Sequence, residues 1–326
     1  MKQFDLTAMR DKTMYNCGFI VVKPTTLNIN LYKAVVNMSR PNQRFNDQQL
    51  FNKMLYSYRR NNVQIRATFL DPRLYMDGLL YFQKMIRLLP RTNDKCSAVK
   101  KTNCSVLVVH NNWIITKQAK IYRFREHYMW SYDGKDGYYS NQSRNYIMYT
   151  NPDPYNISRQ DLRNSQLSSL VKALALGYLL DRTVILPKFY CTPMGHICPL
   201  NSYLHIANFD NVFKGNYRES NFLQNAKVPN AVKKHLSNQS LISYATRLSP
   251  SRKQLAIDSN RVVSLFYGSK DRLINFGILA RIKITFSDNS TEHTFNQKVY
   301  RAFRENNYKQ FSAGAFIGRS LLVYDS

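Results

Sequence analysis

Four short segments in the first half of the chain carry side chains that could bind a polar ligand or a metal ion. In the segment 109–120, His110 ends an apolar, strand-like run, and ligands bind beyond the carboxyl ends of parallel strands. A neutral imidazole there can ligate a divalent cation. Lys120, about three helical turns further on, could contact a diphosphate. The other three segments are 16–19 (NCGF), 46–52 (NDQQLFN) and 71–82 (DPRLYMDGLLYF).

These side chains also have structural alternatives. A histidine at the end of a strand often serves packing alone. Asp47 is as good an N-cap for a helix as it is a ligand for a sugar hydroxyl. The residue types leave both alternatives open, so the case for a site depends on whether the segments meet in the fold.

The elements that must position these residues alternate between strands and helices. Short apolar, β-branched runs predict the strands, and apolar residues three and four positions apart predict the helices. Such an alternation is typical of an α/β protein with a parallel sheet. The expected elements are a strand at 19–23, a helix at 25–39, a helix from 46 or 47, a strand at 63–70, a strand at 105–110 and a helix at 116–126.

The turn-rich segment 131–155 interrupts this alternation and favours a domain boundary. Beyond it, Ser158 and Asp161 resemble a capping box, which predicts a helix running to about Leu180. A strand at 182–186 is expected next, ending at a proline. Further strands are expected at 262–267, 278–286 and 321–324.

The chain is strongly basic, but its charge is dispersed. Its 326 residues include 47 Lys and Arg against 20 Asp and Glu, a net charge of +27. The balance is +15 over residues 1–150 and +12 over 151–326. There is no basic run, zinc-finger spacing or RNA-recognition signature. This pattern favours a solvated surface first and an anionic glycan or phosphate-rich ligand second. A nucleic-acid partner comes third, because it rests on net charge alone.

The cysteines and the glycosylation sequons favour an oxidising compartment. Cys191 and Cys198 are close enough in sequence to form a short disulfide loop, and Cys96 and Cys104 are a less certain pair. Cys17 is left over. Six Asn-x-Ser/Thr sequons give mild support for a secretory lumen. The first 13 residues are polar, unlike a signal peptide, and no run of 18 apolar residues occurs.

Together the four segments resemble glycosyltransferase family 77, whose nucleotide-diphospho-sugar transferases include plant arabinosyl- and xylosyltransferases. The family shows an Asn-x-Gly-Phe strand, a helix with Asp-Gln and then Phe-Asn, an Asp…Gly-x-x-Tyr-Phe segment, and His-x-Asn-Trp before a lysine-containing helix and a tryptophan. The matching residues here are Asn16, Gly18, Phe19, Asp47, Gln48, Phe51, Asn52, Asp71, Gly78, Tyr81, Phe82, His110, Asn112, Trp113, Lys120 and Trp130.

The resemblance implies a fold and two domains. Residues 1–135 would be the C-terminal portion of a GT-A-like nucleotide-sugar transferase domain, and residues 150–326 an appended α/β domain. The implied reaction moves a sugar, expected to be a pentose, from a nucleotide diphosphate to a glycan or glycoprotein hydroxyl with retention of configuration. The complete protein would be a single-pass type II membrane protein of the Golgi lumen, with any anchor encoded upstream of this chain. No nucleic-acid partner is implied.

The resemblance also assigns roles to residues and a metal to the complete domain. Gln48 would lie near the anomeric carbon, with Asp47 as its catalytic neighbour. Asp47 and Asn16 would orient the donor sugar, and Gly18 would line its site. Lys120 would contact the diphosphate, and His110 would ligate Mn²⁺.

The sequence departs from the family pattern at three places. An Asp-x-Asp motif is absent before Asn16, Cys17 stands where the family often has Thr, and Thr116 stands where it usually has Gly. The chain is therefore expected to begin partway through the domain, to bind a nucleotide sugar weakly and to turn it over little. The alternative function is a non-catalytic scaffold that binds a glycan or a partner.

The second half carries its own resemblance. The run 174–191 (LALGYLLDRTVILPKFYC) resembles the segment that follows the transferase domain in relatives of the plant arabinosyltransferase type. A related Leu-x-Arg-Thr-x-x-Leu-Pro run occurs in protein O-fucosyltransferases. Physically this run predicts a helix packed on a strand, with apolar core residues.

Overall fold

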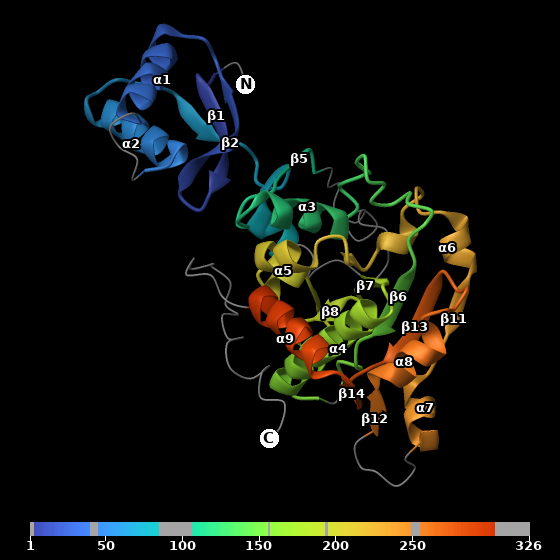
Figure 1. Cartoon of the computed structure of the whole chain (residues 1–326). Coiled ribbons are helices and arrows are strands. Elements are labelled where there is room, and N and C mark those ends of the chain that lie inside the picture. The colour runs from blue at the N-terminus through green and yellow to red at the C-terminus, as the bar shows by residue number, and fades with distance from the viewer. Residues whose placement is uncertain are drawn as a thin grey trace. The chain divides into compact units, whose positions relative to one another are not determined.

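The computed structural model describes residues 3–39, 45–84, 106–155, 157–192, 195–248 and 255–303. The chain divides into two compact units, Met1–Trp113 and Ile114–Ser326 (Figure 1).

The division falls earlier than the turn-rich segment 131–155. Helix α3 (Lys117–Glu126) packs against α5 (Ile206–Phe213), and the buried Tyr122 on α3 contacts Tyr217. This helix therefore belongs to the second unit by packing. The assignment of residues 1–135 to one transferase domain stays a prediction.

The first unit is built on a three-stranded sheet of order β2-β1-β3. Strand β1 pairs antiparallel with β2 and parallel with β3, and β4 pairs parallel with β5. The elements are β1 Leu6–Asp11, β2 Met14–Val22, α1 Thr26–Ser39, α2 Asp47–Arg60, β3 Ala67–Phe69, β4 Tyr75–Asp77, the π-helical turn η1 Leu80–Lys84 and β5 Val108–His110.

Both helices predicted for this unit are confirmed, but strand β1 escaped prediction. In β1, Leu6, Ala8 and Met9 are almost fully buried, and Thr7 between them is only 7% exposed. A strand buried on both faces lacks the alternation of apolar and polar residues that marks a half-exposed strand. Strand β2 also begins five residues before the apolar run from Phe19.

The core of the first unit forms where α1 and α2 pack on the sheet. Leu31 and Val35 from α1 and Leu50 and Leu55 from α2 are buried with Leu6 of β1. Each fully buried aliphatic side chain contributes roughly 1.5–3 kcal/mol, which fixes the start of α2 against the sheet.

The second unit contains a five-stranded parallel sheet with helices on its faces. Its elements are α3, β6 Tyr146–Thr150, α4 Arg159–Leu179, β7 Thr183–Ile185, β8 Phe189–Tyr190, β9 Ile197–Cys198, η4 Leu200–Ser202, α5, β10 Tyr217–Arg218, η5 Phe222–Gln224, α6 Asn230–Lys234, β11 Leu236–Asn238, α7 Leu241–Leu248, β12 Leu255–Asp258, α8 Ser259–Phe266, β13 Leu273–Ile278, β14 Ile282–Thr285 and α9 Asn289–Phe303.

The sheet order is β10-β7-β6-β13-β11, with every pair parallel. Successive residues of one strand enter cores on opposite faces: Ile147 packs in one cluster and its neighbour Tyr146 in the other. Val184 and Ile185 divide in the same way. Both faces of the sheet are therefore covered, as expected of a parallel sheet. The α/β class is confirmed.

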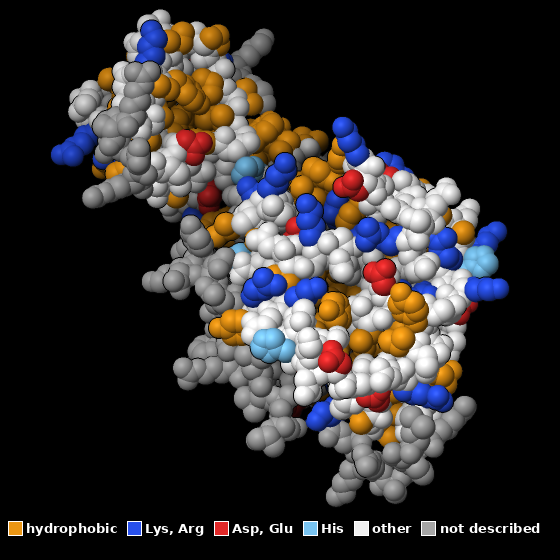
Figure 2. Space-filling model, in the orientation of Figure 1, with side chains coloured by type: hydrophobic (Ala, Val, Ile, Leu, Met, Phe, Trp, Pro, Cys, Tyr) orange, Lys and Arg blue, Asp and Glu red, His pale blue; other side chains and the backbone are white. Residues whose placement is uncertain are grey.

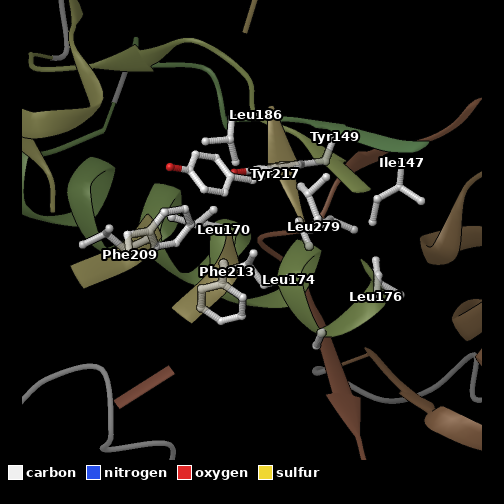
Figure 3. Packing of buried hydrophobic residues seen from close by; sticks show 14 of the residues in the cluster. Ile147, Tyr149, Leu170, Leu174, Leu176, Leu186, Phe209, Phe213, Tyr217 and Leu279 are labelled. Carbon is white, nitrogen blue, oxygen red and sulfur yellow. The ribbon is translucent and has the colours of Figure 1, made fainter. Parts of the chain in front are cut away.

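Helix α4 covers one face of this sheet, as the sequence predicted. Ser158 caps it by accepting a hydrogen bond from the Asp161 amide. A Cβ at Gly177 would lie 2.8 Å from both the Arg182 carbonyl oxygen and Val184 Cγ2, so glycine permits the close approach of α4 to β7. Figure 3 shows Leu170 and Leu174 of α4 within the core that also holds aromatic residues from α5 and β10.

Two strand predictions for the second unit need correction. Residues 262–267 lie largely in helix α8, because Asp258 caps it and Val262 and Phe266 bury one helical face. The predicted strand 278–286 shrinks to β14, while β13 ends at Ile278. The predicted strand 321–324 lies outside the described residues.

The disulfide between Cys191 and Cys198 is confirmed, with a Cα–Cα distance of 5.5 Å. Cys17 is free, and Cys96 and Cys104 lie outside the described residues. Within the described ranges, no helix has the length and apolar character needed to cross a membrane.

Candidate functional site

The candidate site centres on an irregularity in β2. Ala8 of β1 pairs with Ile20, and the next residue, Met9, pairs with Asn16. The three residues 17–19 therefore have no partner on β1, and they include two residues of the Asn-x-Gly-Phe motif. Bulges of this kind redirect side chains and are frequent beside functional sites.

His110 lies directly against this bulge. It ends β5, where it is the register partner of Asp77 on β4. A Cβ placed on Gly18 would lie 2.0 Å from Cε1 and 2.5 Å from Nε2 of the His110 ring. The imidazole therefore occupies the space that any other side chain at position 18 would need. Two residues from separate motifs, 92 positions apart, are in contact.

Gln48 reaches the same bulge from the first turn of α2. Its Oε1 accepts a hydrogen bond from the Cys17 amide at 3.3 Å, and its Nε2 donates to Asp11 Oδ2 at 3.1 Å. Next to it, Asn16 Oδ1 accepts from the Gly18 amide at 2.7 Å. These bonds hold the Gln48 carboxamide in one orientation beside the bulge.

Asp47 is the first residue of α2 but does not cap it. The cap is Asn46, whose side chain accepts from the Gln49 amide while the Gln49 side chain accepts from the Asn46 amide. The Asp47 carboxylate is exposed, and it accepts a hydrogen bond from the neighbouring Gln48 amide at 2.8 Å. Burial and the nearby Asp47 charge raise the pKa of the Cys17 thiol to about 11, so the thiol stays neutral at physiological pH.

Five of the six predicted site residues belong to the first unit, and four of them surround the bulge in contact with one another or with Cys17. Lys120 lies on α3 in the second unit, where it is exposed. In the first unit a different lysine, Lys12 of the β1–β2 turn, lies with its Nζ 4.7 Å from the Trp113 ring centroid. The functional roles of all six residues stay predictions.

Thr116 shows what one departure from the family pattern does to the backbone. It caps α3 with φ 76° and ψ 150°, and its hydroxyl accepts from the Ala119 amide at 3.3 Å. This conformation is favourable for glycine and strained for a β-branched residue. A family glycine at this position would adopt it without strain.

The sequence analysis missed Asp11 and did not explain Asn52. Asn52 accepts from the Tyr15 amide at 2.9 Å and donates to the Tyr15 carbonyl at 2.8 Å. Together with Gln48 it satisfies backbone groups along the edge of β2. Asp11 could have been found from its position at the end of β1, but that strand was itself not predicted.

A separate group of buried charges lies in the second unit. The ring of Tyr138 lies between two guanidinium groups, with Cζ of Arg125 at 3.4 Å and Cζ of Arg218 at 4.1 Å from its centroid. Its hydroxyl donates to Glu219 at 2.6 Å. Burial raises the pKa of the nearby Glu126 to about 8, although the Leu200 amide bond opposes the shift.

The mixed α/β fold of the chain is consistent with a nucleotide-sugar transferase domain. Residues 2–124 match the family model of nucleotide-diphospho-sugar transferases. The match covers less than half of the chain and includes all six predicted site residues. It supports a glycosyltransferase-like function that uses a nucleotide-sugar donor and an acceptor. Neither the curated proteins nor the solved structures contain a significant match to the chain.

Proposed function

We propose that this chain forms part of a retaining glycosyltransferase of the family 77 kind, which transfers a pentose such as arabinose or xylose to a glycan or glycoprotein hydroxyl. The observation that carries the proposal is the contact between Gly18 and His110, with Gln48 held at the same bulge. Residues from three motifs of one transferase family thus meet at one place, inside the segment that matches a nucleotide-sugar transferase model.

The proposed roles follow from the chemistry of each group. The exposed Asp47 carboxylate can accept hydrogen bonds from donor-sugar hydroxyls. Gln48 uses one amide proton on Asp11, and its second amide proton can donate to the sugar or to a departing oxygen. Asn16 fixes the Gly18 backbone through its side-chain oxygen. Lys120 would contact the diphosphate, as the family resemblance implies.

The complete domain is proposed to require Mn²⁺, but the described residues do not fit a complete site for it. Within these ranges, no three His, Cys, Asp or Glu side chains are close enough to share an ion. Mn²⁺ prefers carboxylate oxygens, so His110 alone would hold it poorly. No step of the reaction is therefore assigned to a metal on these residues.

A non-catalytic scaffold of the same fold is the second candidate. Both ends of the Gln48 carboxamide are hydrogen-bonded, and Asn52 bonds the same edge of β2, so these side chains have a structural role even without a ligand. Such a scaffold would use its basic surface to bind an anionic glycan or a partner enzyme.

Ligand-detected NMR with a panel of nucleotide sugars separates the two candidates. We expect weak binding of at least one donor by the wild-type chain. Asp47→Ala should raise the Kd about tenfold, because it removes a charged hydrogen-bond acceptor for the sugar hydroxyls. Asp136→Ala removes an exposed carboxylate in the second unit and serves as the matched control. Absence of binding by every donor would favour the scaffold.

Activity and location are tested separately. Release of nucleoside diphosphate in the presence of Mn²⁺ should be low, because the described residues lack a complete ligand set. Rapid metal-dependent turnover by this chain would contradict that reasoning. The proposed Golgi location is tested by microscopy of the tagged protein against a Golgi marker, and a diffuse cytosolic signal would overturn it.

A further inference from the structure

A groove of about 720 Å³ lies on the first unit between α1 and the end of β2. Its volume is within the range of small-molecule binding sites. None of the six predicted site residues lines it. Figure 2 shows hydrophobic side chains gathered on this unit beside α1. The groove is lined by Val22, Lys23, Pro24, Asn28, Ile29, Tyr32, Lys33, Val36 and Asn37.

The walls of the groove are apolar and open to solvent. Ile29 is 46% exposed and Val36 is 50% exposed, although α1 buries Leu31 and Val35 on its other side. Ile29 and Val36 lie two helical turns apart, so both project from one face of α1. The two side chains form a short apolar wall along one side of the groove.

One polar group at the groove lacks a partner. Asn28 is 1% exposed, and its Nδ2 donates to the Asp5 and Lys23 carbonyl oxygens at 2.9 Å each. Its Oδ1 is buried and accepts no hydrogen bond. A buried acceptor without a donor is costly, and this atom lies beneath the groove surface, so a ligand donor would reach it only if the lining moved.

Tyr32 adds a neutral donor to the same lining. Burial, together with the neighbouring Cys17, raises the pKa of Tyr32 to about 12. The phenol therefore stays protonated throughout the physiological range and can donate to a ligand oxygen.

The charges at the groove favour an anion. Lys23 and Lys33 line it, and no acidic residue does. Asp5, whose backbone carbonyl accepts a hydrogen bond from the groove residue Asn28, pairs its carboxylate with Arg66 at 3.0 Å. The anionic group of a ligand is therefore assigned to Lys33, which lines the groove from α1.

We propose that this groove binds a small amphiphile with an apolar body and one carboxylate or phosphate group. The apolar body would lie against Ile29 and Val36, and the anionic group would contact Lys33. This ligand matches the apolar walls, the positive charge and the drug-sized volume together. The proposal does not rest on the proposed function.

The test uses the full chain and 11-(dansylamino)undecanoate as the fluorescent probe. The probe should bind saturably, and decanoate should displace it while decanol displaces it far less. Lys33→Glu should raise the probe Kd about tenfold or more, because a charged contact becomes repulsive. Lys53→Glu is the matched control, since it makes the same charge change at an exposed position on α2. Equal affinities of the two variants would overturn the proposal.

A second pair of variants tests the apolar wall. Val36→Asp should weaken probe binding at least fivefold, whereas Leu27→Asp, on an exposed α1 residue outside the groove, should not. A diazirine-labelled fatty acid should crosslink to the peptide covering residues 22–37. Labelling elsewhere, or binding to anionic vesicles without binding to the monomeric probe, would refute a small-molecule site, and the vesicle result would identify a lipid-surface contact instead.

Discussion

The contact between Gly18 and His110 can be tested by a double-mutant cycle. In Gly18→Ala, the new methyl group would overlap the imidazole, whose nearest atom lies 2.0 Å from the ideal Cβ position. Overpacking of this kind costs about 1–3 kcal/mol, and the stiffer alanine backbone returns about 0.5–1 kcal/mol. We expect Gly18→Ala to lower the unfolding free energy of the first unit by about 0.5–2 kcal/mol.

Removal of the ring should reverse the sign of the effect. In a His110→Ala background the space beside Gly18 is open, so Gly18→Ala should stabilise the unit by about 0.5–1 kcal/mol. The coupling energy between the two positions then equals the overpacking cost of about 1–3 kcal/mol.

Urea unfolding of the four proteins measures this coupling. The chain has two tryptophans, one in each unit, so a Trp130→Phe background leaves Trp113 as the fluorescent reporter of the first unit. Gly268→Ala, followed by circular dichroism, is the matched control, because a Cβ there meets no atom within 4 Å. Its effect should be the same with and without His110. A coupling between Gly18 and His110 below about 0.5 kcal/mol would refute the contact and, with it, the geometry of the candidate site.

Three further predictions concern the second unit. The folded-state pKa of Glu126 is about 8 against an ordinary value of 4.5, so the unfolding free energy should fall as pH rises from about 4.5 to 8, by at most about 1.4 kcal/mol per pH unit. Glu126→Gln should flatten this slope in urea titrations, and an unchanged slope would show that the carboxyl is not buried as described. Thr116→Gly relieves the backbone strain and should stabilise the chain by about 0.5–1 kcal/mol. Thr116→Val loses the hydroxyl cap but keeps the strain, so it should destabilise the chain by about 1 kcal/mol. Thermal melts that rank the two variants in the reverse order would contradict the strain at this position. Replacing Cys191 and Cys198 by serine should cost about 2 kcal/mol, as expected for a loop of this length, with Cys17→Ser as the control that leaves the response to reductant unchanged.

The four helices that the sequence predicted are present as α1, α2, α3 and α4, but α5, α6, α7, α8 and α9 were not predicted. Helices α1, α2 and α4 each begin at a side-chain cap, from Thr25, Asn46 and Ser158, and this signal is local. Strand β1 is buried on both faces and so has no alternating pattern. The β-branched pair Val262-Val263 in the middle of α8 favours a strand by propensity, but the Asp258 cap and the packing of one helical face decide for a helix.

The candidate site was predictable only as a set of residues. Spacing placed Asn16, Gln48 and His110 in separate motifs, and the family pattern suggested that they meet. The bulge that joins them depends on how β2 pairs with β1, and no local signal marks it. Asp11, which holds Gln48, could be found only once β1 was known.

The parallel sheet of the second unit has a consequence for synthesis of the chain. Its central strand β6 pairs with β13, and Leu273 lies 123 positions after Thr150. At a translation rate of about 5–20 residues per second, β13 emerges roughly 6–25 s after β6. Throughout that interval the strand YIMYT has one unpaired edge and is open to pairing with other nascent chains. Release of the chain before residue 273 would leave that edge unpaired permanently, so products that terminate early should aggregate and should be bound by chaperones more strongly than the full-length chain.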